Sequence, residues 1–243
     1  MPRPTVPFRR GLLAAALVCA LPAALHAQTS ATYDLTLRGL RAATLSFNGQ
    51  EANGRYAAAA ALRSAGLLKM VKTLGFEASS EGVLQSGRFR PSRYTEKVDT
   101  ASRKSSAELG WRGGVPEVRQ VQPPREARAR DVDPATQGGT IDPMTAIFAG
   151  LRDQSRAGMC TLDATLFDGR RQSRVVLSRP VAEGRNVICT GLYQRIAGFS
   201  DREMAEKTDF PFQITYAPGP DGLMQARQVR METLYGPALL TRR

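Results

Sequence analysis

The sequence predicts an all-β fold, a strongly curved antiparallel sheet, barrel-like or a β-spiral, with two short helices. Apolar and polar residues alternate with a period of two in most of the chain. Glycine-containing turn signals separate these runs at Asn53–Gly54, Gly113–Gly114, Asp168–Gly169 and Asp221–Gly222. Each run has one apolar face, which suits a sheet that curls around a core.

The first 27 residues have the features of a secretory signal peptide. Three arginines precede the apolar stretch GLLAAALVCALPAAL, which is too short to span a bilayer comfortably, and LHA ends it before Gln28. We therefore expect cleavage after Ala27 and a periplasmic mature protein without a membrane-spanning segment. A lipoprotein signal around Cys19 is the weaker alternative, because ALV precedes it where a leucine and two small residues are required.

Export would change the composition of the chain. Removing 27 of its 243 residues leaves 216, enough for one domain, which we expect to span residues 28–243. The net charge of +12 falls by three arginines to +9, and the only histidine, His26, leaves with the leader. Without histidine, the mature chain has no Ser-His-Asp, Cys-His or histidine-zinc site. We expect no metal, no cofactor and, outside the cytoplasm, no nucleic-acid partner.

The strands are predicted from the alternation itself. In YDLTL, the side chains of Tyr33, Leu35 and Leu37 share one face. An Asn48–Gly49 pair after Phe47 predicts a turn at that point. The same alternation predicts strands in ATLSFNG (43–49), SSAELGW (105–111), PFQITYA (211–217) and QVRMETLY (228–235).

A first helix is predicted in SAGLLKMVKTLG, residues 64–75. Ser64 is a suitable N-cap and Gly75 a suitable stop. The apolar residues between them recur at helical spacing: Leu67, Met70, Val71 and Leu74.

A second helix is predicted in IDPMTAIFAGLRD. Asp142 is its N-cap, worth about 1 kcal/mol, and Pro143 suits the first helical position. Its apolar face comprises Met144, Ile147, Phe148 and Leu151. Both helices would plug an open end of the sheet; the alternative is that one of them gates a hydrophobic cavity. The candidate ligand-binding or lid residues are Leu67, Leu68, Met70, Val71, Ile147 and Phe148.

Residues 119–139, RQVQPPREARARDVDPATQGG, predict a long, flexible surface loop, because they are polar, rich in proline and mixed in charge. Asp131, Asp133 and Asp142 stand at positions one, three and twelve of a calcium loop. Thr136 occupies the position at which such a loop needs glycine, and the twelfth residue is not glutamate, so calcium is not favoured.

Two cysteines remain in the mature chain, Cys160 in CTLDATLF and Cys189 in NVICTGLY. In an oxidising compartment they predict a disulfide that joins the first and third strands of a meander. Closing a loop of about 30 residues contributes on the order of 3–4 kcal/mol. A redox pair is the alternative, but neither a C-x-x-C spacing nor a thiolate-stabilising neighbourhood is present.

The sequence contains few signatures of catalysis. GFSDR at 198–202 lacks the second glycine of a nucleophile elbow. The carboxylates of Asp142, Asp163 and Asp168 are candidates for acid and base chemistry, although spacing alone does not place them in one cleft. A solvent-facing strand position for Asp163 and a hairpin turn for Asp168 are the favoured explanations.

Several blocks, in their order along the chain, resemble one family. They are YDLTLRGLRAATLSF, LRSAGLLKMV before FEASSEGVL, FRPSRYTEK, DPATQGGTIDPMTAIF, CTLDATLFDGRR and CTGLYQRIAGFS. Together they look like the bacterial exported proteins of domain of unknown function 3108, over nearly the whole mature chain. The resemblance implies a periplasmic or envelope-associated protein without an established enzymatic activity and, by analogy with other exported proteins, a strongly curved sheet.

We therefore expect a non-enzymatic periplasmic binding module for an envelope lipid, a lipoprotein or a partner protein of the envelope, supporting envelope integrity. One alternative is a carboxylate-dependent hydrolase of envelope glycans. The other is a structural envelope protein without a ligand.

Overall fold

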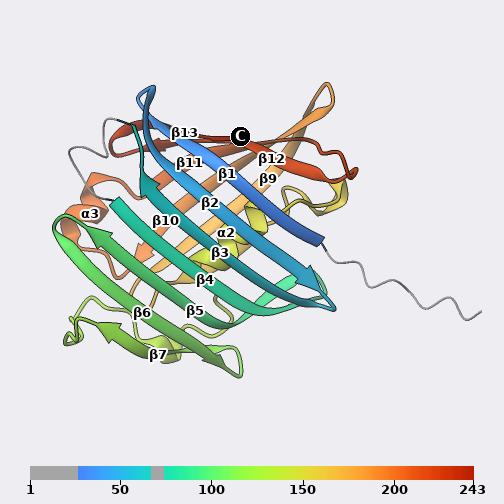
Figure 1. Cartoon of the computed structure of the whole chain (residues 1–243). Coiled ribbons are helices and arrows are strands. Elements are labelled where there is room, and N and C mark those ends of the chain that lie inside the picture. The colour runs from blue at the N-terminus through green and yellow to red at the C-terminus, as the bar shows by residue number, and fades with distance from the viewer. Residues whose placement is uncertain (1–26, 67–73) are drawn as a thin grey trace, which may run out of the picture.

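The computed structural model describes residues 27–66 and 74–243. The described strands form one antiparallel sheet that curls into a nearly closed barrel (Figure 1), so the predicted all-β fold is confirmed. The strands are β1 (Ala27–Leu37), β2 (Leu40–Ala52), β3 (Arg55–Ser64), β4 (Leu74–Gln85), β5 (Arg88–Thr100), β6 (Arg103–Arg112), β7 (Val115–Gln122), β8 (Asp163–Phe167), β9 (Gln172–Glu183), β10 (Asn186–Ala197), β11 (Asp209–Pro218), β12 (Met224–Thr233) and β13 (Gly236–Arg242). The helices are η1 (Pro134–Thr136), α2 (Pro143–Leu151), η2 (Arg156–Gly158) and α3 (Asp201–Glu206).

The order of the strands determines where the barrel stays open. Neighbours in the sheet are consecutive in the chain except where β1 pairs with β13. The two edges are therefore β7 and β8, which follow one another in sequence. Residues 123–162, which connect them, contain η1, α2 and η2. We call the gap between β7 and β8 the seam.

The core lies inside the curved sheet. Inward-facing residues of distant strands, such as Phe47, Tyr94 and Leu109, are buried, as the period-two pattern predicts. Buried tyrosines also need partners for their hydroxyl groups. The hydroxyl of Tyr216 donates to the carbonyl oxygen of Gly150 at the end of α2 (2.7 Å), which joins the sheet to the helix.

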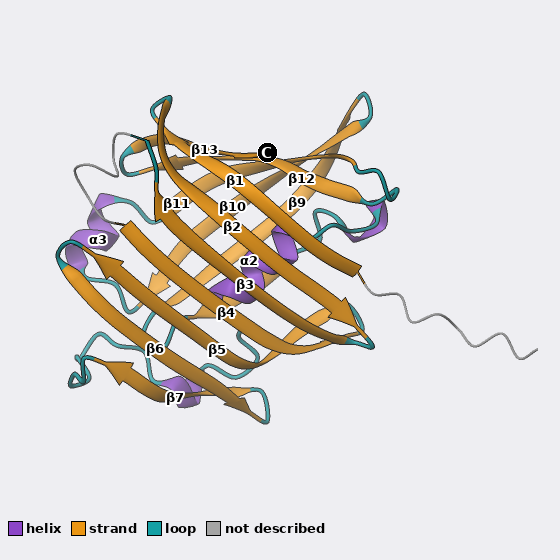
Figure 2. Cartoon of the chain, viewed as in Figure 1, coloured by secondary structure: helices purple, strands orange, loops and turns teal. Residues whose placement is uncertain are grey.

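Helix α2 lies inside the barrel, between strands of the front and back of the sheet (Figure 2), and contacts β3, β4, β5, β8 and β12. Its predicted start is confirmed, because the Asp142 side chain accepts a hydrogen bond from the backbone N–H of Thr145 and Pro143 begins the helix. Seven of its nine residues are buried, so neighbouring elements cover the helix on most sides and not only along one apolar stripe. Of the two predicted lid residues on this helix, Ile147 is half-buried and Phe148 is buried.

The predicted turn at Asn48–Gly49 is wrong. Both residues lie within β2, and the chain turns at Asn53–Gly54, where both φ angles are positive (52° and 70°). Gly49 has a packing role instead. A Cβ atom at this position would lie 2.6 Å from Cε2 of Phe148, so glycine lets the ring of the internal helix approach the strand.

Replacing Gly49 with alanine should therefore destabilise the fold by about 2 kcal/mol, because the added methyl group overpacks the core against Phe148. Urea denaturation of the parent and the variant measures the change. Gly138→Ala is the matched control, because a Cβ there has only Val115 Cγ2 within 4 Å, at 3.8 Å. Equal losses of stability in the two variants would contradict a specific contact with Phe148.

The first predicted helix, over residues 64–75, is not bounded as expected. Ser64, the predicted N-cap, is the last residue of β3, and Gly75, the predicted stop, lies in β4. Ser64 is opposite Ala43 of β2 and Gly75 is opposite Arg63 of β3, so strand pairing overrides their local capping preference. Leu67, Leu68, Met70 and Val71 lie outside the described residues.

The sequence analysis did not predict α3. Ser200 caps it in a capping box, in which the side chain of Glu203 accepts from the Ser200 backbone N–H and the Ser200 hydroxyl accepts from the backbone N–H of Glu203. The S-x-x-E spacing was the available signal.

The predicted loop at 119–139 is shorter in the structure. Residues 119–122 belong to β7, because their backbone pairs with β6, and η1 occupies 134–136. The Asp131 carboxylate holds part of the remainder, accepting from the Arg125 guanidinium (2.6 Å) and the backbone N–H of Arg128 (2.9 Å). The polar composition therefore reflects local ion pairs and turns rather than a chain without contacts.

Two residues near strand ends differ from the alternation pattern. Cys160 does not lie in a strand, because β8 begins at Asp163 and Cys160 has a positive φ of 57°. Tyr235, the last residue of the predicted strand 228–235, lies beyond the end of β12 and is 70% exposed. In both cases a turn interrupts the period of two.

Candidate functional site

A cavity of about 1130 Å³ lies along the seam, and we call it the seam cavity. Its walls come from the β4–β5 and β6–β7 turns, from residues 136–141, from the C-terminal end of α2 and from the starts of β8 and β9. The exposed residues Arg88, Arg90 and Thr161 line it, so it is open to solvent.

The seam cavity exists because the seam is only partly bridged. Residues 134–141, the seam segment, run between the two edge strands. The backbone N–H of Gly139 donates to the Gly114 oxygen beside β7 (2.9 Å), and that of Ile141 donates to the Thr165 oxygen in β8 (3.0 Å). An isolated parallel bridge between Ile141 and Leu166 replaces a full strand ladder. The wall is therefore incomplete next to the helix.

Aromatic and aliphatic side chains form the apolar part of the lining. Trp111 is half-buried, and its indole N–H donates to the carbonyl oxygen of Thr140 (3.1 Å), which fixes the indole against the seam segment. Phe89 packs edge to face on Phe148, with the ring centroids 5.8 Å apart. Leu162 adds an aliphatic surface to the lining. These side chains give the seam cavity a surface suited to hydrocarbon.

Four arginines also line the seam cavity: Arg88, Arg90, Arg152 and Arg174. Arg174 is neutralised by Asp163, whose two carboxylate oxygens accept from its guanidinium (3.0 and 2.8 Å). In the described part of the chain, neither Arg88 nor Arg90 has an ion pair or a side-chain hydrogen bond. The lining therefore carries uncompensated positive charge.

Arg152 follows the last residue of α2 and is the most enclosed of the four. Its backbone N–H donates to the Phe148 oxygen (3.0 Å). Its guanidinium carbon lies 4.9 Å from the centroid of the Phe89 ring and 5.7 Å from that of Phe148. Burial lowers the pKa of the guanidinium from its ordinary value, and the Glu51 carboxylate at 3.9 Å opposes this effect. Arginine nevertheless stays charged at neutral pH.

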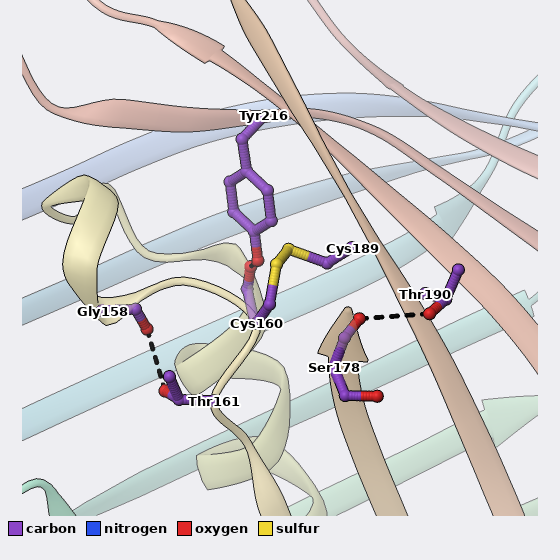
Figure 3. The surroundings of a disulfide bond; sticks show 8 residues. Gly158, Cys160, Thr161, Ser178, Cys189, Thr190 and Tyr216 are labelled. Carbon is purple, nitrogen blue, oxygen red and sulfur yellow. Dashed lines mark hydrogen bonds between the residues drawn. A yellow bond between two sulfur atoms is a disulfide. The ribbon is translucent and has the colours of Figure 1, made fainter. Parts of the chain in front are cut away.

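The disulfide forms part of the same wall. Cys160, which lines the seam cavity, is bonded to Cys189 in β10, with a Cα–Cα separation of 5.4 Å (Figure 3). The bond ties the connection after α2 to the sheet, and the Thr161 hydroxyl donates to the Gly158 oxygen beside it (3.0 Å). The predicted Cys160–Cys189 bond is therefore present. It joins the connection after α2 to β10, whereas the prediction had it joining two strands.

A buried polar cluster holds the other end of α2. The Asp142 carboxylate accepts from the Thr145 backbone N–H (2.8 Å), the Thr145 hydroxyl (2.6 Å) and the Ser80 hydroxyl (2.7 Å). The hydroxyl groups of Tyr56 and Thr145 are 2.7 Å apart. Burial of the carboxylate raises the pKa of Asp142 to about 6, although the hydrogen bonds from Thr145 and Ser80 oppose the shift.

The structure separates the three candidate catalytic carboxylates by environment. Asp142 is buried and caps α2, whereas Asp168 accepts from the backbone N–H groups of Arg170 and Arg171 in the β8–β9 turn (3.0 and 2.8 Å). Only Asp163 of the three lines the seam cavity, where it pairs with Arg174. Each carboxylate thus has a structural partner.

The candidate lid residues are only partly placed. Ile147 and Phe148 lie on α2 inside the barrel, where Phe148 stacks on Tyr56 with a centroid separation of 5.5 Å. The other four lie outside the described residues.

Sequence reasoning missed the arginines of the seam cavity. The segment GRFRP around Phe89 and the arginine directly after the second helix were visible signals. The sequence did not show that these arginines meet in one cavity, because long-range packing brings residues 88–90 and 152 together.

In residues 27–66 and 74–243, no group of three or more potential metal ligands gathers. No helix in this described part of the chain is long and apolar enough to cross a membrane.

Comparison with known proteins identifies a fold and a family. The structure is similar to a crystal structure described as a β-barrel-like protein of domain of unknown function DUF1849 from Brucella abortus, with a TM-score of 0.51 and 14% identity. The match covers 89% of this chain and 96% of that one, and at this identity it shows the fold alone. No curated protein matches the chain. A family model matches residues 32–194, about two thirds of the chain, so the chain belongs to the family described as protein of unknown function (DUF3108).

Proposed function

We propose that this protein is an exported, non-enzymatic binding protein of the cell envelope, which holds a lipid or a lipid-linked partner in the seam cavity. The observation that supports this proposal is the cavity itself. Its volume of about 1130 Å³ exceeds the 300–1,000 Å³ of common ligand sites, so an acyl chain fits within it.

The chemistry of the lining supports an amphiphilic ligand. Phe89, Trp111 and Leu162 provide apolar contact, while the arginines and the threonine and glutamine side chains make the larger part of the lining polar. A ligand with a hydrocarbon part would cover the Phe89, Trp111 and Leu162 surfaces and remove them from water.

Two features support export to the periplasm. The first 27 residues have the composition of a leader, with three arginines before an apolar stretch. The Cys160–Cys189 disulfide is compatible with an oxidising compartment.

Filling the seam cavity should weaken the binding of an apolar ligand. Gly138 lines it, its φ lies outside the left-handed region, and a Cβ there has only Val115 nearby. Gly138→Trp should therefore weaken the binding of N-phenyl-1-naphthylamine, an uncharged dye that fluoresces when it leaves water, by at least about tenfold. Fluorescence titration of the mature protein measures the dissociation constant.

Gly138→Ala is the matched control and should bind the dye as the parent does. Absence of dye binding to the parent, or equal binding to the parent and Gly138→Trp, would contradict a ligand-binding cavity at the seam. Native mass spectrometry of protein purified from periplasm then addresses the natural ligand, and a lipid-sized mass that Gly138→Trp lacks is the expected result.

A further inference from the structure

We propose that the ligand of the seam cavity is an anionic amphiphile, whose negatively charged headgroup is bound by Arg152 while Arg88 and Arg90 attract it at the entrance. This inference rests on the proposed function and adds the chemical class of the ligand. The shared chemistry is a phosphate, sulfonate or carboxylate group attached to an apolar body.

Arg152 forms one ion pair, with Glu51, but lacks the hydrogen bonds that an enclosed charge normally makes. Its side chain is 17% exposed, and in the described residues no side-chain or backbone oxygen accepts a hydrogen bond from its guanidinium. The Glu51 carboxylate, 3.9 Å away, is too distant for a hydrogen bond. Enclosed charges are usually paired and hydrogen-bonded, so the five N–H donors of Arg152 have unused capacity.

The position of Arg152 is restrained before any ligand binds. Its backbone closes the last turn of α2, and its guanidinium lies beside the rings of Phe89 and Phe148. The C-terminal end of a helix also favours a cation. A donor group held in place in this way loses little side-chain entropy when it binds an anion.

The neighbouring charges favour an anion over a cation. Arg88 and Arg90 are exposed, line the same cavity and have no partner in the described part of the chain. The one acidic residue of the lining, Asp163, is already paired with Arg174 through two hydrogen bonds. The excess of positive charge raises the local concentration of anions and repels cations.

The apolar walls distinguish an amphiphile from a free anion. The guanidinium of Arg152 lies 4.9 Å from the centroid of Phe89, so an anion bound to Arg152 places any attached group close to the aromatic surface. The planar fork of arginine also matches the oxygen pairs of phosphate, sulfonate and carboxylate groups.

A matched pair of dyes tests the inference. 1-Anilinonaphthalene-8-sulfonate has the same ring system as N-phenyl-1-naphthylamine and carries one sulfonate. The anionic dye should bind the parent about tenfold or more tightly than the uncharged dye. Arg152→Gln should remove most of this difference and leave the affinity for the uncharged dye unchanged. Arg230→Gln, which alters an exposed arginine on β12, is the control.

Two further variants keep the test valid if Arg152→Gln folds poorly. The double variant Arg88→Gln, Arg90→Gln changes only exposed side chains and should weaken binding of the anionic dye, most strongly at low salt. Arg152→Lys retains the charge but loses the planar fork, and its affinity should lie between those of the parent and Arg152→Gln.

The source of the anionic group is tested by competition. Dihexanoyl phosphatidic acid should displace the anionic dye at lower concentration than dihexanoyl phosphatidylcholine, and inorganic phosphate alone should not displace it. Equal displacement by the two lipids, or displacement by inorganic phosphate at the same concentration as phosphatidic acid, would overturn the inference. Equal affinities of the parent for the two dyes would also overturn the anionic-ligand inference, but would leave the seam cavity as a binding site. If neither dye binds, the proposed function itself is overturned.

Discussion

Replacing Asp142 with alanine is expected to lower the free energy of unfolding by about 3 kcal/mol. An exposed N-cap is worth about 1 kcal/mol, but this carboxylate is fully buried and accepts three hydrogen bonds. Its removal takes the acceptor from the buried Thr145 backbone N–H and from the Ser80 and Thr145 hydroxyl groups. These hydroxyl groups keep only their weaker contacts with each other, with the Tyr56 hydroxyl and with the Arg93 oxygen. Urea denaturation at pH 7 measures the loss, and a loss of 1 kcal/mol or less would show that the buried cluster adds nothing to the cap.

Asp142→Asn separates the hydrogen bonds from the charge. Burial raises the pKa of Asp142 to about 6 from an ordinary value of 3.8. Between these pH values the folded protein keeps a proton that the unfolded chain has lost, so the contribution of Asp142 to stability is largest below pH 4 and falls as the pH rises to 6. Asparagine retains the cap acceptor and does not titrate. The stability of the parent relative to Asp142→Asn should therefore decrease by about 2–3 kcal/mol over this range.

The comparison of the two proteins removes the effects of other titrating groups. Glu203, for example, has a pKa lowered to about 2, mainly by the hydrogen bond from the Ser200 backbone, and titrates equally in both proteins. Parallel profiles of stability against pH for the parent and Asp142→Asn would contradict a raised pKa at Asp142.

Breaking the disulfide is expected to be the second large effect. Cys160 and Cys189 are 29 residues apart, and the loop-entropy model gives about 3–4 kcal/mol for a closed loop of this length. The variant with alanine at both positions should melt about 10 °C below the parent. Reductant should lower the melting temperature of the parent by a similar amount and leave the double variant unchanged.

Calorimetry with and without reductant makes this measurement. A parent melting curve that reductant does not move would contradict a stabilising disulfide. The single variants Cys160→Ala and Cys189→Ala should resemble the double variant, because either substitution opens the loop.

Much of the fold was predictable because its signals are local. The alternation around Tyr33, Ile214 and Tyr216 reflects the period of a strand, which depends on neighbouring residues alone. The start of α2 was predictable for the same reason, since an N-cap and a proline act within one turn.

Local rules failed where a distant residue decided the outcome. Asn48–Gly49 has turn chemistry, yet the close approach of the Phe148 ring requires glycine within a continuous strand. Ser64 and Gly75 have capping chemistry, yet the pairing of Ser64 with β2 and of Gly75 with β3 places both in strands.

The sequence by itself determined the all-β class, the position of α2, the disulfide pair and the resemblance to one family, because these depend on short-range patterns and on residue types. Only the tertiary structure decided that the gap falls between β7 and β8 and that Arg88, Arg90 and Arg152 line one cavity. It also decided that Asp142 is buried beside Ser80. The physical reason is that strand register and the path of residues 123–162 bring these residues together, and no local pattern encodes either of them.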